Sequence, residues 1–482
     1  PLRRQRQMCI RDSIYLLVML AIGYYSSKKI TSNEDFMVAG RNLGPILLAG
    51  TLSATEIGGG SSLGVAEKAY GTWGLGASWY VTTMGIAFVI LSFVAHKFRA
   101  AEVKTVPEYF RRRYGRSAGL ITSIIMLLPL VGLTASQFIA SATIVSVMIG
   151  VSPKIAVTIV ALVVTVYAIM GGLWAVALTD FVQVFLIVLG MFLAIPFSLN
   201  LAGGMDKVIA NVPPETMSLF SGIKVSTIIG LVIMYIASFT VGQEAVSRFY
   251  AAKNGKVAVQ GSIISAVINF VYAFIPTILG ITTLALVNMN KLDSAVIMKD
   301  GAKYALPHLA MNTMPAIIVG LLFSGIISAT MSSADSDLLG AGSIFSNDIY
   351  KIYINPKATS DQVMKTTKIT MIIVGILGWV IAMTNTSNLI NILMFSFTLR
   401  AAGAFFPYVF GLYWKKSSLQ GTIASLIAGS VVVILIENSE TKNFYGLDPI
   451  IPGLIASFIF FIGFTLLMPS DRENCDLIPE DE

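Results

Sequence analysis

One short glycine-rich stretch interrupts a long apolar segment and limits what the chain can fold into. The segment runs from about Leu43 to Tyr70, and its middle reads Thr51-Leu-Ser-Ala-Thr-Glu-Ile-Gly-Gly-Gly-Ser-Ser62. Each glycine costs about 1 kcal/mol of helix propensity, and a carboxylate at mid-bilayer depth costs about 2.5 to 3.5 kcal/mol on insertion scales. We therefore expect the helix to break here.

A helix break at membrane depth has a functional meaning. Irregular backbone survives there only where protein or a water-filled cavity surrounds it, and secondary transporters use broken midplane helices to expose carbonyl groups and helix ends to ions and substrates. The stretch thus predicts a binding site within residues 54–62, including Glu56, Gly58 and Gly59. A glycine face packed closely against a neighbouring helix is the alternative, but it would not explain Glu56.

Composition indicates a membrane protein. The 482 residues are 55% hydrophobic and only 12% charged, and the mean hydropathy is +0.78, whereas a soluble domain carries roughly 25% charged residues. The net charge of +7 lies in short loops between apolar segments, where basic residues report topology, so no nucleic-acid partner is implied. We expect an all-α polytopic membrane protein.

Residue counts exclude several chemistries. The two cysteines, Cys9 and Cys475, and the two histidines, His96 and His308, can build neither a disulfide framework nor a His/Cys metal site. The sequence has no Walker loop, so ATP is not the expected energy source.

Thirteen apolar segments predict about 13 transmembrane helices. Residues 1–12 resemble translated adapter sequence and are set aside as a non-native leader. The first segment, residues 13–28, then holds only about 14 apolar residues, fewer than the roughly 20 needed to span, and is interpreted as a truncated first helix. The other twelve segments lie at 43–70, 77–96, 118–149, 155–171, 173–199, 225–248, 257–287, 314–345, 366–385, 388–413, 419–437 and 449–468.

Basic residues predict the orientation. If the amino terminus is outside, they fall on one side of the membrane, in the loops at 28–29, 97–116, 253–256, 351–368 and 415–416. By the positive-inside rule that side is the cytoplasm, and it also receives the tail, residues 469–482. We expect a multi-pass protein of the plasma membrane with its carboxyl terminus in the cytoplasm.

Charged and polar residues at membrane depth indicate where function lies. They are Glu56, Asp180, Asp335 and Arg400, accompanied by Gln243 and Glu244. At about 3 kcal/mol each, the first four would cost roughly 12 kcal/mol of insertion free energy, which is comparable to the stability of a whole domain. Such groups persist when they are paired, solvated by a cavity or serve a bound ion. A purely structural ion-pair network is the alternative.

One predicted helix carries three oxygen donors on a single face. Ser332, Asp335 and Ser336 are spaced i, i+3, i+4 and therefore line up along the helix. Hard oxygen donors suit a hard cation better than a soft metal. A serine-rich packing interface is the alternative, but it does not require an aspartate.

Five motifs occur in order along residues 23–414. They are Ser32-Asn-Glu-Asp-Phe-Met-Val-Ala-Gly-Arg-Asn-Leu-Gly44, Gly171-Gly-Leu-Trp-Ala-Val-Ala-Leu-Thr-Asp180, Ala329-Thr-Met-Ser-Ser-Ala-Asp-Ser336, Asn347-Asp-Ile-Tyr350, and Phe406-Pro407 with Gly411-Leu-Tyr-Trp-Lys-Lys416. Together they resemble the sodium:solute symporter family. The resemblance implies a five-plus-five inverted repeat of the leucine-transporter type, with repeats at 43–199 and 225–413 and accessory helices at 419–468.

The same resemblance implies two cation sites. Carried over by position, the family's sodium site would use backbone carbonyls and two serine hydroxyls, at Ala54, Ile57, Ala329, Ser332 and Ser333. Members similar to sialic-acid transporters have a second sodium site, which would map to Asp180, Ser332, Asp335 and Ser336. Asp335 replaces a serine of that pattern, so the site could bind a second sodium or a proton.

Two stretches resemble the high-affinity choline transporter branch of the family, Thr55-Glu-Ile-Gly-Gly-Gly60 and Met331-Ser-Ser-Ala-Asp-Ser336. Quaternary ammonium recognition relies on aromatic faces. Here Glu56 stands where that branch has tryptophan, and Gly242 stands where an aromatic residue precedes Gln243. These departures argue against choline.

We therefore expect a sodium-coupled symporter, not an enzyme, that imports a small polar solute, zwitterionic or carboxylate-bearing, such as an amino acid. Glu56 would meet an ammonium group and Arg400 a carboxylate, because arginine presents a planar fork that matches a carboxylate. The candidate substrate contacts are Glu56, Gly58, Gly59, Gln243 and Arg400. The expected partners are the solute, sodium and the lipid bilayer. The alternatives are a choline-like, sugar or vitamin substrate, and a membrane sensor or channel.

Overall fold

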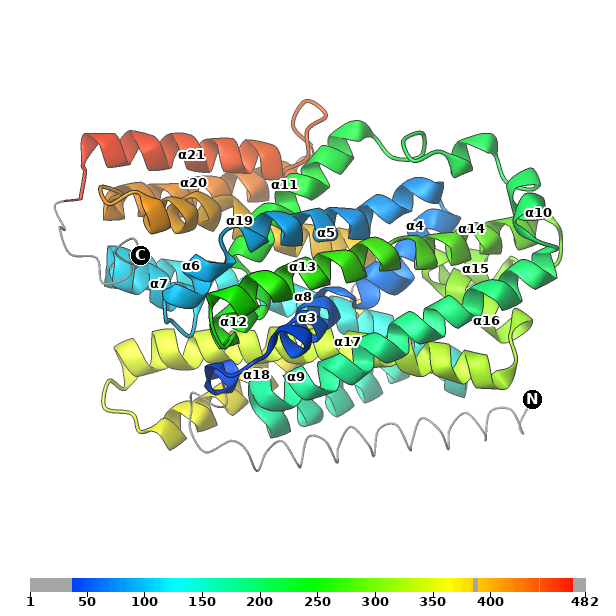
Figure 1. Ribbon diagram of the computed structural model, residues 1–482, viewed down its shortest axis with the longest axis horizontal. Helices are drawn as coiled ribbons and strands as arrows, with labels where there is room; N and C mark the ends of the chain where they lie inside the picture. The colour runs from blue at the N-terminus through cyan, green and yellow to red at the C-terminus, as the bar shows by residue number, and fades with distance from the viewer. Residues whose placement is uncertain (1–36, 385–388, 442, 471–482) are drawn as a thin grey trace.

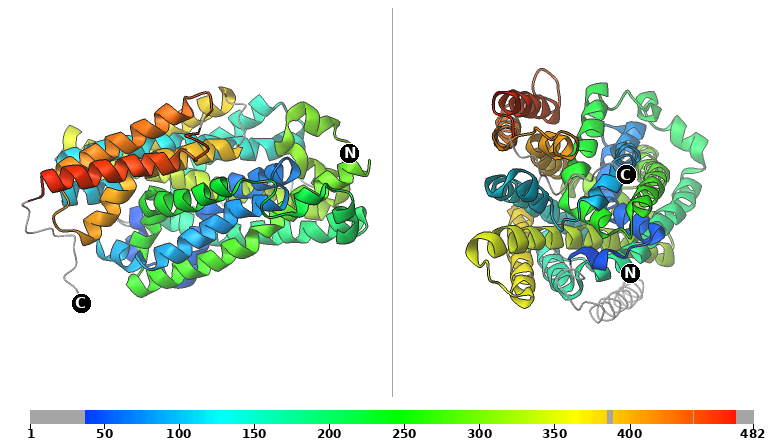
Figure 2. Two further views of the ribbon diagram at one scale, coloured as in Figure 1. Left: turned by 90° about the horizontal axis from the view of Figure 1, so that it is seen from above. Right: turned by 60° about the vertical axis from the view of Figure 1, so that its left-hand side comes forward.

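The computed structural model describes residues 37–384, 389–441 and 443–470, and within them the fold is all helical (Figure 1). The expected leader, the truncated first helix and most of the tail lie outside these residues. Apart from two isolated bridges, the described part contains no strand. The helices run side by side along the long axis of the molecule (Figure 2).

The long helices follow the apolar segments. In the first half of the chain they are α3 (Pro45–Glu56), α4 (Val65–Tyr70), α5 (Trp79–Ser92), α6 (Ala95–Ala100), α7 (Val106–Tyr114), α8 (Arg116–Ile149), α9 (Pro153–Ala202) and α10 (Met205–Ala210). In the second half they are α11 (Val225–Val241), α12 (Gln243–Ala251), α13 (Gly255–Tyr272), α14 (Phe274–Asn288), α15 (Ala295–Asp300), α16 (Ala305–Thr313), α17 (Ala316–Ile344), α18 (Ser360–Thr384), α19 (Leu389–Tyr413), α20 (Leu419–Glu437) and α21 (Ile450–Leu467). The short helices α7, α10, α15 and α16 lie between the apolar segments.

Ten helical stretches of the described residues are long and apolar enough to cross a membrane, and the bent pair α11–α12 would make eleven. The predicted number of about 13 is larger for two reasons. The first predicted helix lies outside the described residues, and the segment at 43–70 is divided into α3 and α4, each too short to be counted. The segments at 155–171 and 173–199 join in the single helix α9, which holds two candidate spans.

The predicted break is present. Helix α3 ends at Glu56, Ile57 leaves the helical region with φ −81° and ψ 68°, and the chain resumes as a π-helical turn, Gly60–Gly64, that leads into α4. A second break separates α11 from α12 at Gly242, whose backbone is extended (φ −70°, ψ 116°), and the two helices meet at a 54° bend. Both breaks coincide with glycine, which has the poorest helix propensity after proline.

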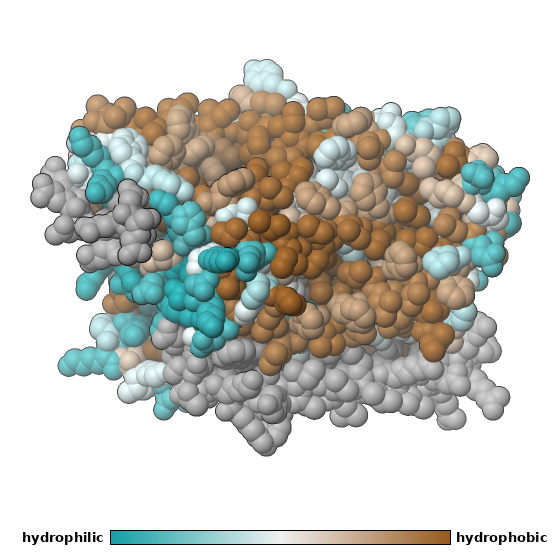
Figure 3. Space-filling model, viewed as in Figure 1, coloured by the Kyte–Doolittle hydropathy of each residue, from teal (hydrophilic) through white to brown (hydrophobic). Residues whose placement is uncertain are grey.

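Helix α17 lies at the centre of the bundle, where it packs against α8 and α9 and also contacts α3 and α12. Helices α20 and α21 pack together on α19 at one edge of the molecule (Figures 1 and 2). Apolar side chains cover most of the visible surface, and polar residues gather toward its two ends (Figure 3). This distribution is the one that a multi-pass membrane protein needs.

Candidate functional site

The end of α3 and the middle of α17 meet through one serine. The Ser333 hydroxyl lies 2.9 Å from the carbonyl oxygen of Thr55, 3.4 Å from that of Ala54 and 3.1 Å from that of Ala329. A Cβ on Gly58 would lie 2.5 Å from the Ser333 oxygen, so only glycine permits this approach. Carbonyl and hydroxyl oxygens thus converge beside the helix break, and hard cations prefer such oxygen ligands.

Ile57 and Ser332 complete the residues expected around this point. Ile57 is the first non-helical residue after α3, and its amide still donates to Ser53. The Ser332 hydroxyl donates instead to Asp180 on α9. Among the described residues, no cluster of three or more acidic, histidine or cysteine side chains has the geometry of a metal site. The oxygen atoms at the break that could bind a cation therefore belong mostly to carbonyl and hydroxyl groups, which are uncharged.

Asp180 is the acceptor in a fully buried network. It is 0% exposed and Arg248 of α12 is 1% exposed, with 3.1 Å between the Arg248 Nη2 and the Asp180 Oδ2. Thr51 donates to the same oxygen and Ser332 to the other. Arg248 also donates to the Ser336 hydroxyl at 2.6 Å and to the Thr51 hydroxyl at 2.9 Å. The network joins α3, α9, α12 and α17.

Arg248 belongs to this buried network but was not expected from the sequence. It closes the apolar segment at 225–248, where a basic residue indicates a helix end at the membrane surface. The bend at Gly242 turns α12 inward instead, and the Arg248 guanidinium donates to the carbonyl oxygens of Thr51 and Glu244. The signal in the sequence was Gly242 followed by the polar residues Gln243 and Glu244, a pattern that predicts a second helix break.

The expected cation face on α17 is divided in the structure. The hydroxyls of Ser332 and Ser336 belong to the network around Asp180 and Arg248. Asp335 is 1% exposed, and neither of its carboxylate oxygens has a hydrogen-bond partner among the described residues. Asp335 nevertheless lies within electrostatic range of Asp180.

Arg400 of α19 has an internal counter-ion. Its Nη2 lies 2.5 Å from the Glu244 Oε1, its Nε donates to the Ser238 hydroxyl at 2.7 Å, and its guanidinium lies 4.8 Å from the centre of the Phe397 ring. A Cβ on Gly242 would lie 2.6 Å from Arg400 and 2.8 Å from Glu244. The glycine of the second break therefore makes room for this ion pair, which was the structural alternative for Arg400.

The remaining expected substrate contacts lie in different surroundings. The Glu56 side chain is 6% exposed, and its Oε1 has no hydrogen-bond partner among the described residues. The amide of Gly59 donates to the Gln137 side chain of α8 at 2.9 Å. Gln243 accepts from the Val106 amide at 2.8 Å and donates to the Lys104 carbonyl at 3.1 Å. Its amide group is therefore occupied by the main chain at the start of α7.

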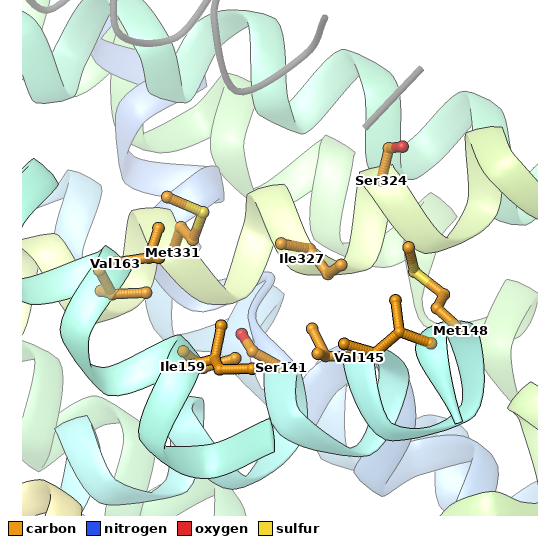
Figure 4. Close-up of a pocket in the computed structure, with 11 residues that line it drawn as sticks. Ser141, Val145, Met148, Ile159, Val163, Ser324, Ile327 and Met331 are labelled. Carbon is orange, nitrogen blue, oxygen red and sulfur yellow. The ribbon is translucent and has the colours of Figure 1, made fainter. Parts of the chain in front are cut away.

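A separate apolar cavity of about 160 Å³ lies between α8, α9 and α17. The labelled side chains in Figure 4 include Val145, Met148, Ile159 and Ile327. The Ser141 hydroxyl at its wall pairs with Thr330, the neighbour of Ala329. No charged residue lines the cavity, so the cavity is separate from the buried charges at the two helix breaks.

Two broken helices against a central helix, with buried charges at the breaks, define a secondary transporter of the leucine-transporter type. The comparisons identify the group within this class. The sodium:solute symporter family model matches residues 36–429, and the chain belongs to this family. It is a sodium-coupled symporter and not an enzyme, and sodium is its co-substrate.

Two bacterial relatives extend over almost the whole chain. The osmoregulated proline transporter OpuE of Bacillus subtilis (strain 168) is 26% identical, with 94% of this chain and 93% of the relative covered. Sodium/proline symporter 2 of Staphylococcus saprophyticus is 28% identical, with 98% and 95% covered. The local likeness to the choline transporter is not shown by these comparisons.

Two solved structures share the fold. A substrate-bound, outward-open Na⁺-coupled sialic acid symporter superposes with a TM-score of 0.81 at 20% identity, covering 97% of this chain and 99% of that one. Mhp1, a nucleobase-cation-symport-1 family transporter in a closed conformation, gives a TM-score of 0.58 at 14% identity, covering 93% and 98%.

Proposed function

We propose that this symporter imports a small amino acid of the proline type, with sodium held at the end of α3. The sodium ligands would be Ala54, Ile57, Ala329, Ser332 and Ser333. The observation that carries the proposal is the convergence of the Ser333 hydroxyl with carbonyl oxygens of α3 and α17 beside the break. The names of the bacterial relatives support proline as the first substrate to test.

The substrate would bind at the same break, on the side of Glu56. The adjoining glycines, Gly58 and Gly59, let a ligand approach the backbone closely. Glu56 would accept the ammonium group of the amino acid. Arg400 faces the same centre, but a substrate carboxylate would have to compete there with Glu244. Gln243 would position the start of α7 rather than touch the substrate.

The sodium gradient is sufficient for this task. A tenfold gradient supplies about 1.4 kcal/mol, and a potential of 100 mV supplies about 2.3 kcal/mol per charge. One sodium ion could therefore accumulate a neutral solute roughly 500-fold.

A second cation locus at Asp335, with Asp180, Ser332 and Ser336, belongs to the proposal. Asp180 would be available to a cation there only after Arg248 had left it. We further propose the orientation that the basic loops predict, with a cytoplasmic carboxyl terminus in the plasma membrane. The repeats at 43–199 and 225–413 would move relative to each other during transport, as in transporters built from inverted repeats.

The test is sodium-dependent uptake of labelled proline by proteoliposomes. The Ser333→Ala variant should require more sodium for half-maximal uptake, because it removes one oxygen ligand. Ser343→Ala deletes the same group from the same helix, away from the break, and should behave like the wild type. Uptake that is independent of sodium, or equal sodium dependence in the two variants, would contradict the sodium-site assignment.

A further inference from the structure

A wall of aromatic side chains leads from the first helix break to the Arg400 ion pair. Tyr80 of α5 contacts Tyr235 of α11 edge to face, with 5.6 Å between ring centres. Tyr235 contacts Phe397 of α19, again at 5.6 Å, and Phe397 carries the Arg400 guanidinium on its ring at 4.8 Å. Three helices thus contribute to one continuous surface beside the break.

Three buried polar groups lie at one end of this wall. The Glu56 Oε1 has no hydrogen-bond partner among the described residues. The hydroxyls of Tyr80 and Tyr235 interact with each other, and neither has another partner among the described residues. Tyr80 points at the break, because its hydroxyl lies 3.2 Å from where a Cβ on Gly60 would be. Glu56 acts electrostatically on both tyrosines. Buried polar groups are rarely left unpaired in folded proteins, and each tyrosine hydroxyl can make more than the one contact with its neighbour. The Glu56 oxygen and the remaining capacity of the two hydroxyls therefore indicate a ligand with matching polar groups.

The other end of the wall is already occupied. Arg400 is neutralised by Glu244 and hydrogen-bonded to Ser238. A carboxylate ligand would have to break that pair, whereas a donor ligand at Glu56 displaces nothing. The unpaired carboxylate oxygen of Glu56 can only accept a hydrogen bond when ionised, and each tyrosine hydroxyl can accept or donate one. The ligand that fits is a cation that carries N–H groups.

We propose that Glu56, Tyr80 and Tyr235 bind the substrate through the N–H groups of its ammonium, so that the transporter selects primary or secondary amines and rejects quaternary ones. This inference rests on the proposed function, because it specifies the substrate class of the same site. In this proposal, hydrogen bonding and not charge distinguishes primary and secondary amines from quaternary ones. A quaternary ammonium has the same charge but no N–H, and it would leave the Glu56 oxygen unpaired.

The experiment is competition against labelled proline in uptake assays driven by an inward sodium gradient, with three unlabelled solutes. Proline has N–H groups, N,N-dimethylproline has the same ring, carboxylate and charge on nitrogen but no N–H, and cyclopentanecarboxylate has no nitrogen. A charge-assisted hydrogen bond accounts for at least about a tenfold difference in affinity. Both N–H-free solutes should therefore compete at least tenfold more weakly than proline.

Two variants test whether Glu56 and Tyr235 are responsible for the preference for N–H groups. Glu56→Gln should weaken proline binding at least about tenfold, and Tyr235→Phe should reduce the discrimination between proline and dimethylproline. The control is Glu102→Gln, because the Glu102 side chain is 70% exposed. The competition assay on the wild type needs no variant to fold.

The outcomes separate this inference from the proposed function. Sodium-dependent proline uptake in which dimethylproline competes as well as proline overturns the inference alone. A Glu56→Gln variant that keeps its proline affinity and changes only its sodium requirement overturns it too, and assigns Glu56 to the ion. The absence of sodium-dependent proline uptake overturns the proposed function, and the inference with it.

Discussion

Replacing Arg248 by methionine tests whether the buried network around Asp180 holds the transport core together. Methionine keeps much of the apolar stem but removes the charge that faces Asp180 at 3.1 Å and the donors to Thr51 and Ser336. Breaking a buried ion pair by removing one partner costs about 3 to 5 kcal/mol, because the other charge stays uncompensated. We expect a loss of this size in the free energy of unfolding.

The assay is unfolding of the purified transporter by SDS in mixed micelles, followed by tryptophan fluorescence. The double variant Arg248→Met with Asp180→Asn should lose less than the sum of the two single variants, by about 1 to 3 kcal/mol. Arg112→Met is the matched control, because Arg112 is 41% exposed in its ion pair with Glu108 and exposed pairs contribute about 1 kcal/mol or less. The reasoning would be refuted if Arg248→Met matched this control, or if the double variant lost the full sum.

Two further predictions concern the second helix break. Gly242→Ala should strongly reduce uptake, because a Cβ there would lie 2.6 Å from Arg400. Gly463→Ala is the control and should transport like the wild type, because a Cβ there would have nothing within 4 Å. Equal uptake rates in the two variants would contradict the conclusion that Gly242 makes room for the ion pair. Arg400→Gln should destabilise the protein by about 3 to 5 kcal/mol by leaving Glu244 unpaired, and Arg400→Gln with Glu244→Gln should recover most of that loss in the same SDS titration. If the double variant folds but loses its affinity for proline, then Arg400 binds the substrate carboxylate.

The sequence by itself determined the membrane class, the helical segments and the first break. These features depend on local properties: apolar length, glycine propensity and the insertion cost of a charge such as Glu56. The i, i+3, i+4 spacing likewise placed Ser332, Asp335 and Ser336 on one side of α17, because helical geometry fixes that relation. The motifs added the family, which the match over residues 36–429 confirmed.

Only the tertiary structure decided which charges meet. Asp180 pairs with Arg248 across 68 residues of sequence, and Arg400 pairs with Glu244 rather than remaining open to a ligand. Each choice depends on how α12 is turned by the bend at Gly242 and on which faces of α9 and α19 it then meets. Sequence periodicity places a residue on a face of its own helix, but it carries no information about the neighbour that the face packs against. For that reason the sequence predicted the break at Glu56 but not the place of Arg248 in the network.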